Sequence, residues 1–196
     1  MPTLDLGPAA RRMADLLSAV TDDQLGRSTP CPAYTLGDLI DHVGSLALAF
    51  TAAATKAGAD ASGQGPSGDA ARLGTDWRSR ISRDLAGLAA EWHDPNAWTG
   101  MTTAGGVDLP GAVAGVVALD ELVVHGWDVA RASGQSYEPD PAELEAVHGF
   151  LAQIAAPDQA AVRGSIFGPI MAVPDDAPML DRVVGLAGRD PAWRPS

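Results

Sequence analysis

Several residue types are scarce in this chain of 196 residues. Cys31 is the only cysteine, so a disulfide within the chain is impossible and a reducing compartment is expected. Three phenylalanines and two tyrosines are few for a protein built from sheets. No apolar run reaches the roughly 20 residues that cross a bilayer, and the first residues lack the basic and apolar regions of a signal peptide. We therefore predict a cytoplasmic protein with no membrane partner.

Basic side chains are scarce as well. Lysine and arginine together number 13, against 25 aspartates and glutamates, which gives a formal net charge of −12. A protein that binds nucleic acid needs a basic face to neutralise phosphates, and an anionic membrane surface makes the same demand. The negative net charge therefore argues against nucleic acid as a partner. Its simplest explanation is that it keeps the protein soluble.

What the chain has in abundance is alanine, the best helix former, arranged with apolar residues at helical spacing. Caps, prolines and glycines mark the helix ends. The predicted helices are Pro8–Val20, Thr35–Lys56, Ala70–Glu91, Pro110–Ser133, Asp140–Ala155 and Ala177–Ala187. A loop is predicted over 58–69, a short hairpin around Gly105-Gly106 within 98–109, and irregular or short-stranded structure over 157–176. The fold class is therefore all-α: a four-helix bundle with a short hairpin and C-terminal helical additions.

We expect residues 1–196 to form one domain, with a core bundle of about residues 5–134 and a C-terminal extension of about residues 135–196. A functional site is predicted on the fourth helix, where Glu121 and His125 are four residues apart and so share a face. His42 lies on the second helix near the edge of the predicted core. If these two helices face each other, two imidazoles and one carboxylate could bind a metal ion and leave coordination positions open. The alternative is a surface Glu–His pair and a structural histidine.

Two segments decide between these interpretations. TPCPAYTLGDLIDH over residues 29–42 and LDELVVHGWDVARA over residues 119–132 resemble the DinB-like superfamily, in particular the actinobacterial branch related to the metal-binding domain of mycothiol-dependent maleylpyruvate isomerase. A third similar segment contains FGP at 167–169, VPDDAP at 173–178 and Asp181-Arg182. The chain departs from the family pattern at Tyr34, where tryptophan is more usual.

The resemblance implies a DinB-like bundle that binds a divalent metal ion through His42, Glu121 and His125. Zinc is the leading candidate, and nickel, iron and manganese also suit this ligand set. The resemblance also implies a metal-dependent enzyme of the mycothiol-linked isomerase or thiol-transferase type, with a small-molecule substrate and mycothiol as a co-substrate. The alternative function is non-catalytic binding of a metal or small molecule. Catalytic residues other than the metal ligands are not assigned, and the oligomeric state is left open between monomer and homodimer.

Residues near the predicted ligands have simpler interpretations. Asp38 is expected to be a helix cap, although it could orient His42, and Asp128 could equally orient His125. Arg131 is expected to pair with Asp128, three residues before it, although it could pair with an anionic substrate instead. Cys31 is expected to be a small buried residue rather than a nucleophile or a ligand. The remaining histidines and tryptophans are assigned to the surface, to packing or to the core: His93, His148, Trp77, Trp92, Trp98 and Trp127.

Overall fold

Helices dominate the protein. We describe it from a computed structural model, which covers residues 4–57, 67–160, 163 and 167–195. The α-helices are α1 (Gly7–Ala19), α2 (Leu36–Ala54), α3 (Trp77–Glu91), α4 (Gly111–Ser133), α5 (Pro141–Ile154) and α7 (Met179–Leu186). The short 3-10 helices are η1 (Asp22–Gln24), η2 (Ala70–Arg72), η3 (Pro95–Trp98) and η4 (Pro157–Gln159). The predicted all-α class is confirmed.

The helix ends follow the local signals in the sequence. The Thr35 hydroxyl accepts from the Asp38 amide, and the Asp38 carboxylate accepts from the Thr35 amide, so α2 begins with the predicted capping box. Gly134 takes the left-handed conformation, with φ of 79°, and ends α4. Each of these ends lies within two residues of its predicted place.

The predicted third helix begins too early. Instead of one helix over Ala70–Glu91, the chain forms η2, turns at Gly74 with a φ of 68°, and begins α3 at Trp77. A left-handed residue cannot continue a right-handed helix, so the helix breaks there. Most of the loop predicted over 58–69 lies outside the described residues.

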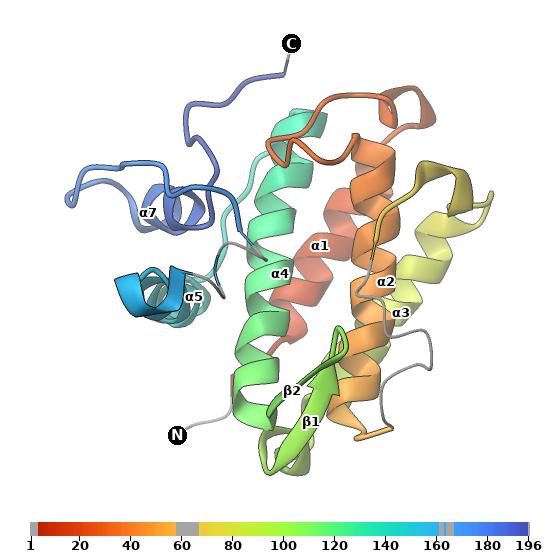
Figure 1. Ribbon diagram of the computed structural model, residues 1–196. Coiled ribbons are helices and arrows are strands. Elements are labelled where there is room, and N and C mark those ends of the chain that lie inside the picture. Colours follow the sequence, from red (N-terminus) through yellow and green to blue (C-terminus); the bar gives the residue numbers. More distant parts are fainter. Residues whose placement is uncertain (1–3, 58–66, 161–162, 164–166, 196) are drawn as a thin grey trace.

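The predicted hairpin is present. β1 (Met101–Ala104) pairs antiparallel with β2 (Val107–Pro110), with Met101 opposite Pro110 and Ala104 opposite Val107. Gly105 and Gly106 both have positive φ, as a two-residue turn between such strands requires. The hairpin packs against α2 and α4 (Figure 1).

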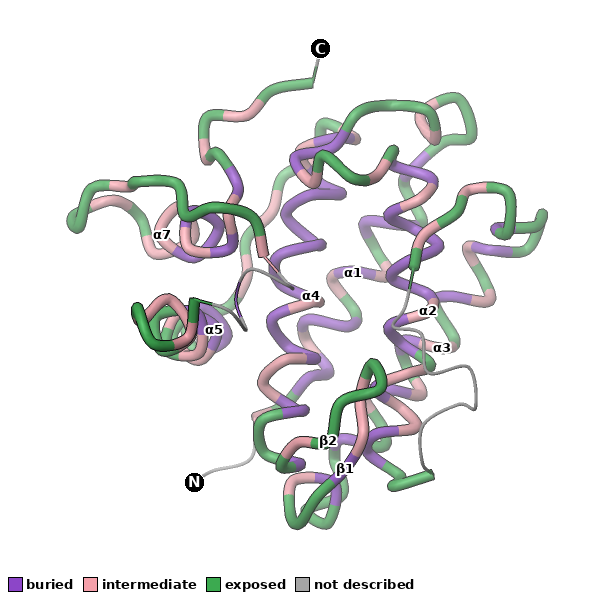
Figure 2. Tube along the Cα trace, in the orientation of Figure 1, coloured by how far each residue is buried: buried purple, intermediate pink, exposed green. Residues whose placement is uncertain are grey.

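The first four helices pack in the ring order α1, α3, α2, α4, so that each contacts two neighbours (Figure 1). Consecutive helices α1 and α2 therefore stand on a diagonal of the bundle, whereas α2 and α4 are neighbours. The sides that face the bundle axis are buried (Figure 2). Trp77, Trp92 and Trp127 are buried, and the Trp98 ring packs edge-on against Trp92, which confirms packing roles for the predicted tryptophans.

The C-terminal elements lie on one side of the bundle. α5 packs against α4, and α7 packs against α5 (Figure 1). Arg12 of α1 donates to Glu143 of α5 over 2.7 Å, which ties the two parts together. Within the described ranges, no helix is both long and apolar enough to span a bilayer.

Candidate metal centre

Three side chains from two neighbouring helices meet inside the bundle. His42 lies in the second turn of α2, while Glu121 and His125 lie one turn apart on α4. Because α2 and α4 are adjacent in the ring, His42 approaches the α4 pair. The sequence positions predicted as ligands are thus brought together by the fold.

The ligand atoms of these residues are close to one another. Each of the three offers one atom, and these atoms all lie within 4.8 Å of one another. The imidazole rings of His42 and His125 are nearly perpendicular, with centroids 5.1 Å apart. Both histidines are buried, whereas the Glu121 side chain keeps 20% of its surface exposed. Among the three side chains, Glu121 is therefore the one that solvent reaches most easily.

Asp128 fixes the orientation of His125. Its carboxylate is fully buried and accepts a hydrogen bond of 2.9 Å from Nδ1 of His125. The other ring nitrogen, Nε2, lies 3.0 Å from Oε2 of Glu121. Carboxylates hold metal-binding histidines in this way in known centres, where they fix the tautomer and raise the basicity of the ligating nitrogen.

The electrostatics of His125 reflect its two carboxylate neighbours. Burial by itself lowers the pKa of His125, but the hydrogen bonds to Asp128 and Glu121 outweigh burial and raise the pKa to about 9. Burial raises the pKa of Glu121, but the hydrogen bond from His125 and the nearby charges of His125, His42 and Arg189 lower it overall. The metal-free protein therefore keeps a positive charge on His125 between two anionic groups.

A divalent cation fits this arrangement. The proton on Nε2 of His125 stands between that nitrogen and the Glu121 carboxylate, where an ion could take its place. Two ligands with metal bonds of roughly 2.1 Å lie at most about 4.2 Å apart. Ligand atoms within 4.8 Å of one another therefore reach a common ion after side-chain movements of an ångström or less. Two imidazoles and a carboxylate also match the ligand set of many catalytic centres.

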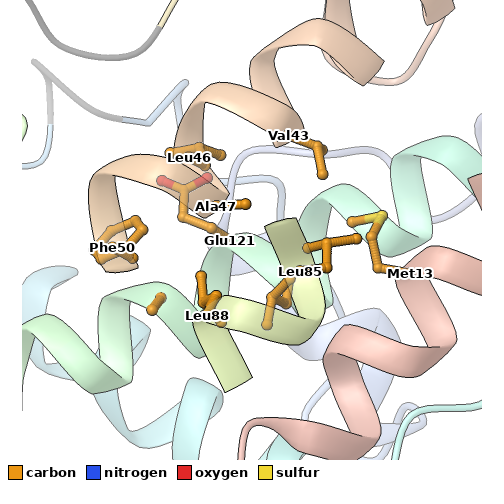
Figure 3. A pocket seen from close by; sticks show the side chains of 10 residues that line it. Met13, Val43, Leu46, Ala47, Phe50, Leu85, Leu88 and Glu121 are labelled. Carbon is orange, nitrogen blue, oxygen red and sulfur yellow. The ribbon is translucent and has the colours of Figure 1, made fainter. Parts of the chain in front are cut away.

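A small cavity adjoins Glu121. It has a volume of about 10 Å³, and Glu121 is the one charged side chain among the ten that line it (Figure 3). The others are apolar residues of α1, α2, α3 and α4, among them Met13, Leu46 and Leu88. A space of this size holds about one water molecule. The cavity therefore has room for one water-sized group next to the Glu121 carboxylate.

The predictions for Asp38 and Arg131, which lie near the predicted ligands in the sequence, had different outcomes. Asp38 caps α2 as expected, and its second carboxylate oxygen accepts from the Ala70 amide. The predicted pair between Arg131 and Asp128 is wrong. Arg131 instead donates to the carbonyls of Pro191 and Trp193.

Arg189 is the residue that sequence reasoning missed. It donates to both carboxylate oxygens of Asp128, at 3.0 Å from Nη2 and 3.4 Å from Nε. Arg189 follows α7 and is 61 positions from Asp128, so no helical spacing could indicate the contact.

Tyr34 is the residue at which the chain departs from the family pattern. Its ring lies beside that of His42, with the two ring centroids 5.1 Å apart.

Cys31 and His148 both lie outside the group of predicted ligands. Cys31 is half-buried, and burial raises the pKa of its thiol, while the charges of Arg189, Asp128 and Glu121 also act on it. Cys31 is therefore within electrostatic range of Glu121 and Asp128 but does not belong to the group of three predicted ligands. Nη2 of Arg182 donates to Nε2 of His148 at 3.1 Å.

Comparison with known proteins identifies the family of this chain. The family model described as the mycothiol maleylpyruvate isomerase N-terminal domain matches residues 6–130, which contain all three predicted ligands. The chain belongs to that family. The recognition made from residues 29–42 and 119–132 is thereby confirmed. The model match ends before α5, so the C-terminal elements lie outside it.

Relatives of this family member span most of its length. Two uncharacterized proteins of Mycobacterium tuberculosis, from strains CDC 1551 / Oshkosh and ATCC 25618 / H37Rv, are each 28% identical over 179 residues. These matches cover 90% of this chain and 91% of each relative, including the segment beyond the family match.

Two solved structures share the fold. Crystal structures of the mycothiol-dependent maleylpyruvate isomerase and of a histidine-to-alanine mutant match with TM-scores of 0.56 and 0.55, at 17% and 18% identity. Each match covers 74% of this chain and 65% of the other chain, so this chain spans about two thirds of the length of those enzymes. At this identity the likeness shows the DinB-like fold alone.

Proposed function

We propose that this protein binds one divalent metal ion through His42, Glu121 and His125. The observation that carries the proposal is the convergence of three ligand atoms from α2 and α4 within 4.8 Å. The buried hydrogen bond from His125 to Asp128 supports it, because that contact turns Nε2 toward Glu121 and His42. Zinc is the leading candidate, although nickel, iron and manganese also accept imidazole and carboxylate ligands.

We propose further that the metal centre is catalytic and acts with a small thiol. When bound, the ion would lower the pKa of a coordinated thiol or water, so that its anion is present at neutral pH. The family and the solved structures with the same fold both carry mycothiol in their names, which supports mycothiol as the co-substrate. The reaction class that follows is isomerisation or thiol transfer on a small molecule. Within the protein, Glu121 and His125 would anchor the ion, and Asp128 would orient the imidazole.

A second candidate is a non-catalytic metal-binding or thiol-binding protein. The size of the cavity favours it, because about 10 Å³ beside Glu121 accommodates a water but no substrate. A substrate would have to approach from the exposed side of Glu121. This difference separates the two functions, since turnover needs room for a substrate next to the ion.

Elemental analysis of the purified protein tests the metal centre. We expect about one ion per chain in the wild type and loss of the ion in His42→Ala and His125→Ala. His93→Ala is the matched control, since His93 is exposed and its nearest ion-pair partner is Asp5, at 3.7 Å. Absence of metal in the wild type, after reconstitution with zinc, nickel and manganese, would contradict the proposal. So would unchanged metal content in His42→Ala.

A cobalt-substituted sample then separates the two functions. Addition of mycothiol should change the visible spectrum of the bound cobalt if the thiol coordinates the ion. Conversion of maleylpyruvate in the presence of mycothiol, lost in Glu121→Gln, supports the enzyme. A spectral change without conversion of any tested substrate supports the binding protein.

A further inference from the structure

The carboxylate of Asp128 joins the metal centre to the C-terminal segment. One of its oxygens, Oδ2, accepts from His125 Nδ1 at 2.9 Å and from Arg189 Nη2 at 3.0 Å. Asp128 is fully buried, and Arg189 keeps 8% of its surface exposed. A chain of charged groups therefore runs from Arg189 through Asp128 to the proposed ligand His125.

Arg189 is itself held in place. Its Nη1 donates to the Ala187 carbonyl at 2.7 Å, and Gly188 turns the chain after α7 with a φ of 81°. The segment is tied to α4 a second time, because Arg131 donates to the carbonyls of Pro191 and Trp193. The guanidinium thus reaches Asp128 from a backbone that is fixed on both sides.

We infer that Arg189 is a positioning residue of the metal centre. Arg189 keeps the Asp128 carboxylate fixed in direction, and that carboxylate holds the His125 ring so that Nε2 faces Glu121. The inference rests on the proposed metal site. It assigns part of that site to a residue outside the region 6–130 that matches the family model.

The physical reason is the sharing of Oδ2. Without the guanidinium, the buried carboxylate would lose both hydrogen bonds from Arg189 and could rotate. A rotated Asp128 carboxylate holds the His125 imidazole less firmly. Removal of such outer partners typically lowers metal affinity by about 10-fold to 100-fold.

Metal titration of the full chain tests this inference. We expect Arg189→Met to weaken zinc binding by about 10-fold to 100-fold and to alter the visible spectrum of the cobalt-substituted protein. Arg131→Met is the matched control, because it cuts the other tie between the C-terminal segment and α4 without touching Asp128. Its affinity should equal that of the wild type. Equal losses in both variants would indicate a general loosening of the segment and would overturn the assignment.

A double-mutant cycle with Asp128→Asn shows whether Arg189 acts through Asp128. In that background Arg189→Met should cause no further loss of affinity, and a fully additive loss would overturn the inference. If Arg189→Met does not fold, Arg189→Lys keeps the charge but only one donor group, and we expect a smaller loss of affinity. Wild-type affinity in folded Arg189→Met overturns the inference and leaves the metal site standing. A wild type that binds no metal contradicts the proposed function instead.

Discussion

Replacement of Asp128 by asparagine should strongly destabilise the metal-free protein. Asp128 is fully buried and faces Arg189, whose side chain is 10% exposed, together with a protonated His125. The substitution removes the negative charge and leaves the buried guanidinium without its partner. Breaking a buried pair in this way costs about 3 to 5 kcal/mol. For a chain of this length each kcal/mol lowers Tm by about 2 to 4 °C, so we expect a decrease of roughly 6 to 20 °C.

Urea and thermal denaturation of the chelator-treated protein, followed by circular dichroism, measure this effect. Asp22→Asn is the matched control, because Asp22 pairs with Arg78 at 2.7 Å but is 78% exposed. It should change the free energy of unfolding by less than about 1 kcal/mol. The double variant Asp128→Asn with Arg189→Met should recover part of the loss, since no unpaired charge remains. A free energy for Asp128→Asn within about 1 kcal/mol of the wild type would refute this reasoning.

Four further predictions concern pH dependence, zinc affinity, packing and thiol reactivity. The pKa of His125 is about 9 in the folded metal-free protein and 6.5 in the unfolded chain, so protonation of His125 stabilises the folded state. This stabilisation is complete below pH 6.5 and is lost as the pH rises from 6.5 to 9. Tm of the metal-free protein should therefore fall over that pH range. Zinc must displace the same proton, so calorimetry should show affinity rising about tenfold per pH unit there, and a flat profile would contradict this. Gly126→Ala places a Cβ 2.6 Å from the Tyr137 hydroxyl and should destabilise by about 1 to 2 kcal/mol in urea, whereas Gly87→Ala, with open space, should stabilise by up to about 1 kcal/mol. Because burial raises the pKa of Cys31, iodoacetamide should modify it more slowly at pH 7.5 than it modifies free glutathione.

Local signals in the sequence predicted most helix ends because they act over a few residues. The Thr35 capping box and the glycine at 134 are examples, and both ends lie where they were expected. Gly74 was overlooked because its left-handed conformation interrupts an otherwise regular apolar pattern over 70–91. The neighbour relation of α2 and α4 was assumed from the bundle class, and the ring order of the helices shows it.

The candidate site was predictable only in part. Helical spacing paired Glu121 with His125, the place of His42 near the core edge of the second helix added the third residue, and the family resemblance supported all three. The same spacing rule wrongly paired Arg131 with Asp128, because it considers one helix in isolation. Arg189 reaches Asp128 from 61 residues away, and a contact of that kind follows from the packing of the C-terminal segment alone.

The ring order of the helices also bears on how the chain folds. α2 and α4 are separated in sequence by all of α3 and the hairpin, and α1 and α4, which also contact each other, are separated by α2 as well. Contacts between distant segments cost more loop entropy and slow the folding of a domain. His42 would therefore meet Glu121 and His125 late in folding, after the local helices have formed. An ion bound there would join two segments that meet late, and it would slow unfolding most if it is released only after they separate.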